Sequence, residues 1–377
     1  MDKMIMTPGP TEINEEVRMA MAKPITNPDL DLEFYEFYKD TTEKVQKLLN
    51  TKNDALILSG EGILGLEAAC ASLIEPGDRV LCIDNGIFGR GFGDFVNMYG
   101  GDCEYLSLDY RNPVDISKLE KFLEEDNDFK MATFVHCETP SGILNPAKEI
   151  SRLLKKHNIL TVMDAVSSVG GEPVDVDDWN VDIALGGSQK VLSAPPGITF
   201  LTVSDDAWDA MDNREAPIVG MYCNLTIWRG WYDKKWFPYT QPISDIYAFN
   251  KALEISLNDG EKYHRHEKIA SATRNAIINS GLELYPNGGY SNTLTALCVP
   301  KGLDDKKIRK HLVDKYKIMI AGAFAALDGK VLRIGHMGEN CREEKVYKTL
   351  KYLDKTFREF NVDLKSKIHE EFVKNLD

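Results

Sequence analysis

Short apolar runs recur through the first half of the chain and predict the strands of a sheet. The seven runs cover residues 55–58, 79–83, 104–108, 131–135, 159–163, 183–185 and 199–203. Helical spacing of apolar residues marks most of the intervals, at 64–74, 88–99, 117–124 and 147–157. Alternating strands and helices predict an α/β domain, in which helices cover both faces of a mostly parallel, seven-stranded sheet.

The pattern changes on either side of this block. A proline-rich arm, too rich in proline for a helix or a central strand, is followed by helical spacing at 12–21 and 30–49. Residues 213–242 are irregular and aromatic, and a segment of this length is usually functional or an interface. One or two helices over 243–278 lead into predicted elements at 295–299, 304–316, 318–320, 330–334 and from about 342. We therefore expect an N-terminal arm over 1–12, a large domain over 13–258 and a smaller α+β domain over 259–377.

Composition narrows the function classes. The chain has 377 residues with 43% hydrophobic residues, which is enough for two cores. Its net charge of -14 argues against a nucleic-acid or anionic membrane surface. We see neither a signal peptide nor an apolar run that could span a bilayer, so we expect a cytoplasmic protein. The cysteines number seven, with no CxxC pair, which favours reduced thiols and no metal site.

Two candidate catalytic residues follow predicted strands. Lys190 comes after the apolar run 181–185 and the sequence Gly-Gly-Ser-Gln, and Asp164 ends the run that begins at Ile159. Open α/β sheets bind ligands at the carboxyl ends of their strands. An amine that can form a Schiff base and a carboxylate that can hold a pyridine nitrogen protonated together suit pyridoxal phosphate.

The glycine loop Ser59-Gly60-Glu61-Gly62 opens a predicted helix and suits a phosphate. It also matches GxGxxG, with Asp84 at the end of the next strand, so an NAD(P)-dependent oxidoreductase is an alternative. Phe88 could stack on a flat cofactor or belong to the core.

Thr139 supplies a hydroxyl at the same row of strand ends. Arg333 lies among apolar neighbours, so we expect a carboxylate partner, either from a substrate or from an internal acid. His264 and His266 resemble a metal pair, but residues two apart on a helix face different ways, and we expect a solvated helix.

Taken together, these segments resemble the class V aminotransferases, and most closely the alanine-glyoxylate and serine-pyruvate aminotransferase group. The motifs that carry the resemblance are Thr7-Pro8-Gly9-Pro10, the glycine loop, Asn85–Gly89, His136–Gly142, Asp164–Ser168, Gly187–Gly197 and Leu332–Gly338. The resemblance covers nearly the whole chain. It implies the fold of the fold-type I pyridoxal phosphate-dependent transferases.

The resemblance also implies a role for each residue of the site. Lys190 would hold pyridoxal phosphate as a Schiff base, and Asp164 would pair with its ring nitrogen. The remaining assignments are stacking by Phe88, a ring-hydroxyl contact by Thr139, phosphate binding by Gly60, Glu61, Gly62 and Gln189, and substrate binding by Arg333 and Gly9. Thr240 would reach the neighbouring subunit's phosphate site, which implies a homodimer with shared active sites.

The function implied is transfer of an amino group between alanine or serine and glyoxylate or pyruvate, by a ping-pong mechanism. Phe237 and Ile63 depart from the family pattern, so their roles stay open. A 2-aminoethylphosphonate transaminase is one alternative. A cysteine desulfurase is another, but the chain has Gln189 where that enzyme usually has His, and no clear catalytic-loop cysteine unless Cys341 serves.

Overall fold

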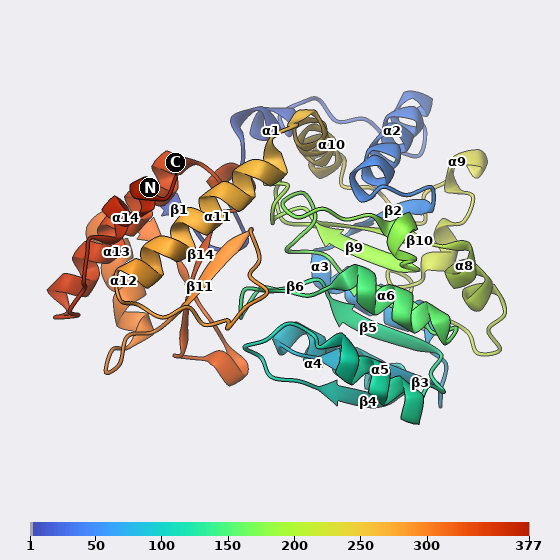
Figure 1. Cartoon of the computed structure of the whole chain (residues 1–377). Coiled ribbons are helices and arrows are strands. Elements are labelled where there is room, and N and C mark those ends of the chain that lie inside the picture. The colour runs from blue at the N-terminus through green and yellow to red at the C-terminus, as the bar shows by residue number, and fades with distance from the viewer. Residues whose placement is uncertain (1–2, 377) are drawn as a thin grey trace.

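The larger of two packed units is built on a seven-stranded sheet (Figure 1). The computed structural model describes residues 3–376. The sheet order is β2-β10-β9-β8-β5-β3-β4. These strands are β2 (Asp54–Ser59), β3 (Arg79–Asp84), β4 (Asp102–Ser107), β5 (Met131–Val135), β8 (Leu160–Asp164), β9 (Ile183–Gly187) and β10 (Ile198–Val203). All seven apolar runs form strands of this sheet, so the predicted α/β architecture is confirmed.

The strand directions bring the predicted catalytic residues to one edge. Strand β10 runs antiparallel to β2 and β9, and the other neighbouring strands are parallel. Asp164 of β8 pairs with Leu185 of β9, only five positions before Lys190. Because parallel strands end at the same edge, Asp164 and the loop that carries Lys190 emerge side by side.

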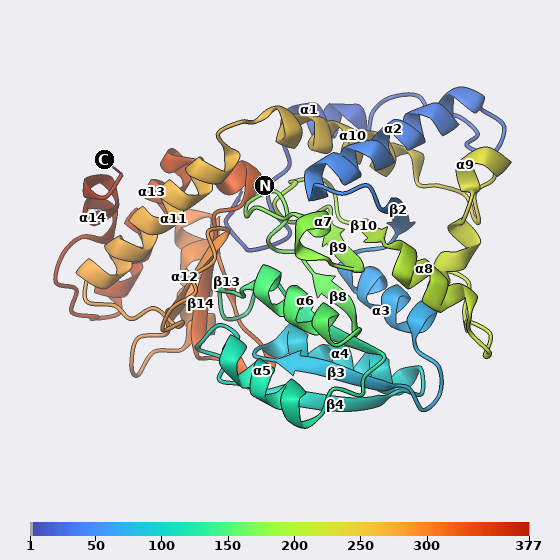
Figure 2. The ribbon, with the colours of Figure 1, turned by 45° about the vertical axis from the view of Figure 1, so that its right-hand side comes forward.

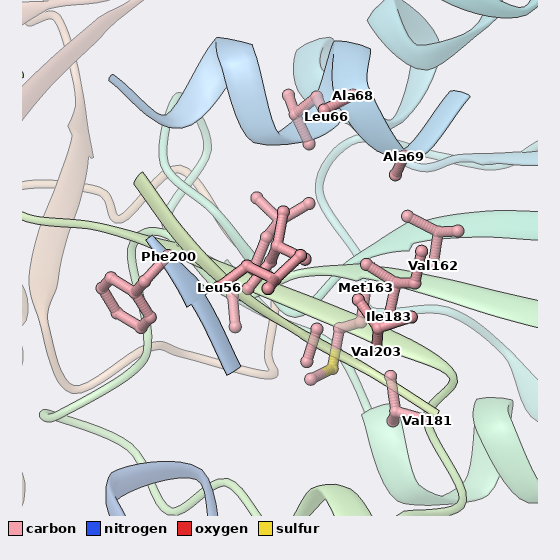
Figure 3. Packing of buried hydrophobic residues seen from close by; sticks show 14 of the residues in the cluster. Leu56, Leu66, Ala68, Ala69, Val162, Met163, Val181, Ile183, Phe200 and Val203 are labelled. Atoms are coloured by element: carbon pink, nitrogen blue, oxygen red, sulfur yellow. The ribbon is translucent and has the colours of Figure 1, made fainter. Parts of the chain in front are cut away.

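Helices cover both faces of the sheet, as the views in Figures 1 and 2 show. Helix α3 (Gly62–Leu73) packs beside α4 (Ile87–Met98) on one face, and α5 (Ile116–Glu125) packs beside α6 (Ala147–Lys156) on the other. Figure 3 shows Leu66 and Ala69 of α3 above Val162 and Met163 of β8. Strands covered on both faces read as continuous apolar runs, which is how the sequence pattern revealed all of them except the edge strand β4, which was revealed by alternating polar and apolar residues.

The irregular segment is organised by aromatic packing. After α8 (Asp205–Asp212) it contains only two short helices, η1 (Leu225–Trp228) and α9 (Trp231–Lys234). Phe237 is buried and stacks on Tyr35 of α2 (Leu32–Leu49), with ring centroids 4.6 Å apart. The family departure at Phe237 therefore lies in the hydrophobic core, where its ring fixes the segment to α2. Helices α1 (Glu15–Ala20) and α10 (Ile243–Asn258) pack together nearby.

The smaller unit combines helices with a three-stranded antiparallel sheet, in the order β11-β14-β13. Its strands are β11 (Leu294–Cys298), β12 (Ile318–Met319), β13 (Ala321–Gly322) and β14 (Val331–Gly335). Its helices are α11 (Lys262–Asn279), α12 (Asp305–Tyr316), η2 (Ala325–Leu327), η3 (Gly338–Asn340), α13 (Glu343–Glu359) and α14 (Ile368–Lys374).

The N-terminal arm joins this smaller unit, which the sequence pattern did not reveal. Strand β1 (Met4–Ile5) pairs in parallel with β12. One buried apolar cluster spans residues 17–253, and a second combines Met6 with residues 269–372. The division at 12 and 258 stays a prediction. Within residues 3–376, none of the helices has the length and apolar character that crossing a membrane requires.

Candidate active site

Eight of the predicted site residues line one cavity of about 150 Å³ at the carboxyl edge of the sheet. They are Gly9, Glu61, Gly62, Phe88, Thr139, Asp164, Gln189 and Lys190. Arg333 does not line the cavity but is bonded to the carbonyl of Thr139, which does, and Gly60 directly precedes the lining residues Glu61 and Gly62. Thr240 is exposed and does not line the cavity within a single chain.

Lys190 is held where its amine readily loses a proton. Its Nζ donates to the Pro8 carbonyl at 2.8 Å. Burial, assisted by the charge of Arg333 and opposed by that of Asp164, lowers the pKa of Lys190 to about 8. A neutral amine is the form that attacks a carbonyl carbon, so the site prepares Lys190 as a nucleophile.

Asp164 ends β8 and is 6% exposed. Its Oδ1 accepts a hydrogen bond from the Val166 amide at 2.8 Å. Burial raises the pKa of Asp164 to about 6, although the Val166 amide and the charge of Lys190 act in the opposite direction. The side chain is therefore mostly ionised at neutral pH and can hold a proton on a basic ring nitrogen.

The arm approaches Lys190 through a glycine. Gly9 has a φ of +97°, and a Cβ atom there would lie 2.3 Å from Lys190 Cδ. A side chain at this position would collide with Lys190 and strain the backbone. Glycine is thus required for the arm to reach the cavity and for the Pro8 carbonyl to reach the amine.

The start of α3 forms the end of the cavity at which the sequence predicts phosphate. Glu61 occupies the N-cap position without a side-chain cap, so the first amide groups of the helix can bind an anion. Gln189 Nε2 donates to Glu61 Oε2 at 3.4 Å. The helix start attracts an anion and the Glu61 carboxylate repels it, so two opposing groups meet here.

Phe88 and Thr139 also line the cavity. Phe88, near the start of α4, meets the exposed ring of Phe324 edge-on, with centroids 6.0 Å apart. Thr139 Oγ1 is hydrogen-bonded to Ser167 Oγ, which also lines the cavity. The sequence predicted no role for Ser167, although it lies three residues after Asp164, within the motif Asp164–Ser168.

Arg333 is 8% exposed and bonds only to carbonyl groups. Its Nε donates to the Gly322 oxygen at 2.7 Å and its Nη1 to the Thr139 oxygen at 3.2 Å. No carboxylate lies within ion-pair distance of it in the part of the chain that the structure describes. Burial, with the nearby charge of Arg309, lowers its pKa to about 10. A buried cation without a counterion suits the carboxylate of a substrate.

Two polar residues, His266 and Asp84, do not have the surroundings that their interpretations from the sequence require. The expectation of a solvated His264–His266 pair is wrong for His266, which is 1% exposed and accepts a hydrogen bond from the Gly338 amide at 3.2 Å. Asp84, the acid needed for the dinucleotide alternative, is buried and accepts hydrogen bonds from Arg90, Ser107 and Tyr110. Asp84 is thus buried and uses most of its acceptor sites within the protein, which disfavours a contact with a ribose.

The cavity residues fit pyridoxal phosphate at its reactive end and along its ring. The amine of Lys190 suits the aldehyde, the carboxylate of Asp164 suits the ring nitrogen, and Phe88 offers a flat face. The amides at the start of α3 and Gln189 suit a phosphate, with Glu61 as the one opposing group.

Comparisons with known proteins agree with this geometry. The family described as Aminotransferase class-V matches residues 11–322. An uncharacterized aminotransferase of Methanocaldococcus jannaschii is 37% identical, over 96% of this chain and 94% of its own length. A pyridoxamine–pyruvate transaminase of Mesorhizobium japonicum is 34% identical, over 88% of this chain and 86% of its own length. The crystal structure of a ureidoglycine–glyoxylate aminotransferase of Bacillus subtilis superposes with a TM-score of 0.95 and 29% identity, covering 100% of this chain and 98% of that one.

Proposed function

The chain belongs to the class V aminotransferases, and from this we propose that it moves an amino group between alanine or serine and glyoxylate or pyruvate. The fold-type I architecture and the pyridoxal phosphate-dependent transaminase class expected from the sequence are confirmed. This class leaves no role for the NAD(P)-dependent alternative. The single observation that carries the proposal is the cavity in which Lys190 and Asp164 meet, with the unpaired Arg333 behind its wall.

The names of similar proteins support small oxo-acid acceptors. The Mesorhizobium relative is named for pyruvate and the Bacillus enzyme for glyoxylate. Neither name favours the 2-aminoethylphosphonate alternative. A desulfurase requires a reactive cysteine, but Cys341 is 0% exposed and lies in the apolar cluster of the smaller unit. Among the described residues, no cysteine lines the cavity.

Each of the site residues has its own role in the proposed reaction. When bound, pyridoxal phosphate supplies an aldehyde that takes up the amino group and a ring that accepts electrons from the substrate α-carbon. Asp164 keeps a proton on the ring nitrogen, and Arg333 binds and orients the carboxylate of the amino acid. In the first half of the reaction Lys190 Nζ removes the proton from the α-carbon of the amino acid, and in the second half it donates a proton to the α-carbon that comes from the oxo acid. Phe88 holds the cofactor ring in place by packing on its face.

We propose a homodimer with shared active sites, in which Thr240 of one subunit reaches the phosphate end of the other. Exposed apolar side chains of the larger unit support an interface. Ile25 is 71% exposed and Leu30 79%, and in the irregular segment Val219 is 71% exposed. Burying such side chains is a main driving force of association.

The seven free cysteines suit the reducing cytoplasm.

An absorbance experiment tests the proposed reaction. Protein loaded with pyridoxal phosphate should absorb in the visible, and added alanine without an oxo acid should shift the band toward that of pyridoxamine phosphate. Lys190→Ala should show neither the original band nor the shift. Initial rates with both substrates should give parallel double-reciprocal plots, whereas intersecting plots would contradict the ping-pong mechanism.

Glu61 favours a second candidate reaction, transfer from free pyridoxamine to pyruvate. A carboxylate at the start of α3 opposes a phosphate dianion but can accept a hydrogen bond from a hydroxymethyl group. A relative that is 34% identical is named for this reaction. Titration with pyridoxal and with pyridoxal phosphate separates the candidates. Tighter binding of pyridoxal than of pyridoxal phosphate, reversed by Glu61→Gln, would support transfer from free pyridoxamine. Tight binding of pyridoxal phosphate by the unaltered protein would exclude that reaction.

A further inference from the structure

Helix α4 begins at the cavity without a cap from its own sequence. Its N-cap residue is Gly86, and its first turn contains no acidic side chain. The first amide groups of a helix lack partners within the helix, and they need acceptors when they are buried. Phe88, whose ring lines the cavity, is the second residue of this helix.

A distant carboxyl group supplies the missing cap. Glu138, in the short strand β6 (Cys137–Glu138), is 0% exposed. Its Oε1 accepts a hydrogen bond from the Gly89 amide at 2.6 Å, and its Oε2 accepts one from the Phe88 amide at 3.3 Å. A Cβ atom at Gly86 would lie 2.2 Å from Glu138 Cδ, so glycine at that position makes room for the carboxyl group.

Glu138 is also linked through the chain to Thr139, another residue that lines the cavity. Thr139 follows Glu138 in the chain, lines the cavity, and accepts a hydrogen bond from Arg333 through its carbonyl oxygen. Glu138 therefore joins the backbone that carries the ring of Phe88 to the backbone that carries Thr139. In the described part of the chain its carboxyl group has no cationic partner, and burial raises its pKa to about 8.

We propose that Glu138 is a positioning residue, whose carboxyl group caps α4 and thereby sets the place of the Phe88 ring against the cofactor ring. The inference rests on the proposed function, because it takes Phe88 to pack on pyridoxal phosphate. Capping needs a hydrogen-bond acceptor rather than a negative charge. Glutamine has one acceptor oxygen, so it can keep the shorter bond from the Gly89 amide, and with it most of the cap, but loses the longer bond from the Phe88 amide. An apolar side chain of similar length keeps neither bond.

Cofactor affinity tests this coupling. Glu138→Met should weaken binding of pyridoxal phosphate by about three- to thirty-fold, the range expected for loss of a helix cap, and Glu138→Gln should restore most of it. In a Phe88→Leu background, Glu138→Met should cause little further loss, because the ring that it positions is absent. An equal loss in both backgrounds would overturn the proposal. The visible circular dichroism of the bound cofactor should change with Glu138→Met and return with Glu138→Gln.

Hydrogen exchange tests the cap without cofactor. The Phe88 and Gly89 amides should exchange faster in Glu138→Met than in the unaltered protein, and unchanged exchange would overturn the proposal. The matched control is Glu172→Met. Glu172 is 3% exposed, its carboxyl group accepts a hydrogen bond from the Asn292 amide, and it does not line the cavity. It should leave cofactor affinity unchanged. If the unaltered protein binds no pyridoxal phosphate, the proposed function fails, but the exchange result still decides whether Glu138 caps α4.

Discussion

The half-buried Lys190 and the buried Arg333 are two cations whose charges influence one another. The charge of Arg333 is the second-largest cause, after burial, of the lowered pKa of Lys190. The residue expected to bind the substrate carboxylate therefore also helps to free the amine of its proton. A substrate carboxylate that neutralises Arg333 would weaken this effect once it is bound.

The lowered pKa of Lys190 predicts how cofactor attachment depends on pH. Only the neutral amine attacks an aldehyde, and its fraction grows as pH rises through the pKa. The rate at which pyridoxal phosphate attaches to the cofactor-free protein should rise with pH, with a midpoint near pH 8, and level off at higher pH. Stopped-flow absorbance measures this rate.

The Arg333 contribution can be tested separately. Arg333→Met removes a nearby positive charge, so the midpoint of the same profile should move to higher pH. If the attachment rate of the unaltered protein still rose steeply at pH 10, this would contradict the lowered pKa of Lys190.

Arg333→Lys tests carboxylate binding. Lysine keeps the charge but loses the planar fork that binds both carboxylate oxygens, so KM for alanine should rise by about 10- to 100-fold, with a smaller change in kcat. Steady-state kinetics with varied alanine measure both constants. Arg274→Lys is the control, because Arg274 bonds to the Ser291 carbonyl and does not line the cavity. An unchanged KM in Arg333→Lys would show that another group binds the carboxylate.

At the scale of elements, the short-range apolar pattern and long-range packing each determine a different part of the fold. The apolar runs predicted every strand of the large sheet. Six of these strands are mostly buried, whereas the edge strand β4 contains no fully buried residue. The irregular segment at 213–242 has no such periodicity, and aromatic contacts with α2 hold it in place. Phe237 stacks on Tyr35 and on Trp231, whose ring lies 5.6 Å away.

We expect Phe237→Ala to lower the free energy of unfolding by about 3–5 kcal/mol, because it removes a buried ring at the centre of this cluster. Urea denaturation followed by tryptophan fluorescence measures the change. Trp236→Ala is the matched control, since this neighbour is 47% exposed and its loss should cost less than about 0.5 kcal/mol. Equal effects of the two substitutions would contradict the structural role of Phe237.

At the scale of the whole molecule, the two units and the arm meet at one site. The arm pairs with β12 of the smaller unit, yet its Pro8 carbonyl contacts Lys190 of the larger one. Arg333 of the smaller unit likewise contacts Thr139 of the larger one. The site therefore depends on how the units are packed.

The proposed dimer predicts a mass of about twice the 42.4 kDa of one chain. Light scattering coupled to size-exclusion chromatography measures it. Leu30→Asp places a charge where an exposed apolar side chain supports the interface, and should shift the protein toward the mass of a single chain. Val373→Asp is the control, because this side chain is also exposed, at 50%, but lies on α14 of the smaller unit. A single-chain mass for the unaltered protein at micromolar concentration would contradict the dimer.

The sequence by itself determined the strands, their alternation with helices and the strand ends at which Asp164 and Lys190 lie. These features are local, since an apolar period or a glycine loop is written in neighbouring residues. Its motifs were also sufficient to identify the family. The helix at 262–279 shows the limit of such reasoning, because spacing alone did not distinguish the buried His266 from the exposed His264.

Only the tertiary structure decided which groups are partners across the chain. The Pro8 carbonyl reaches Lys190 across 182 positions, and Arg333 reaches Thr139 across 194. The Glu138 cap on α4, the lack of a carboxylate near Arg333 in the described residues and the enclosure of Asp84 by three donors also depend on packing between distant segments. Burial then sets the pKa values of Lys190 and Asp164, because the loss of solvent around a charge depends on the whole fold rather than on its neighbours in sequence.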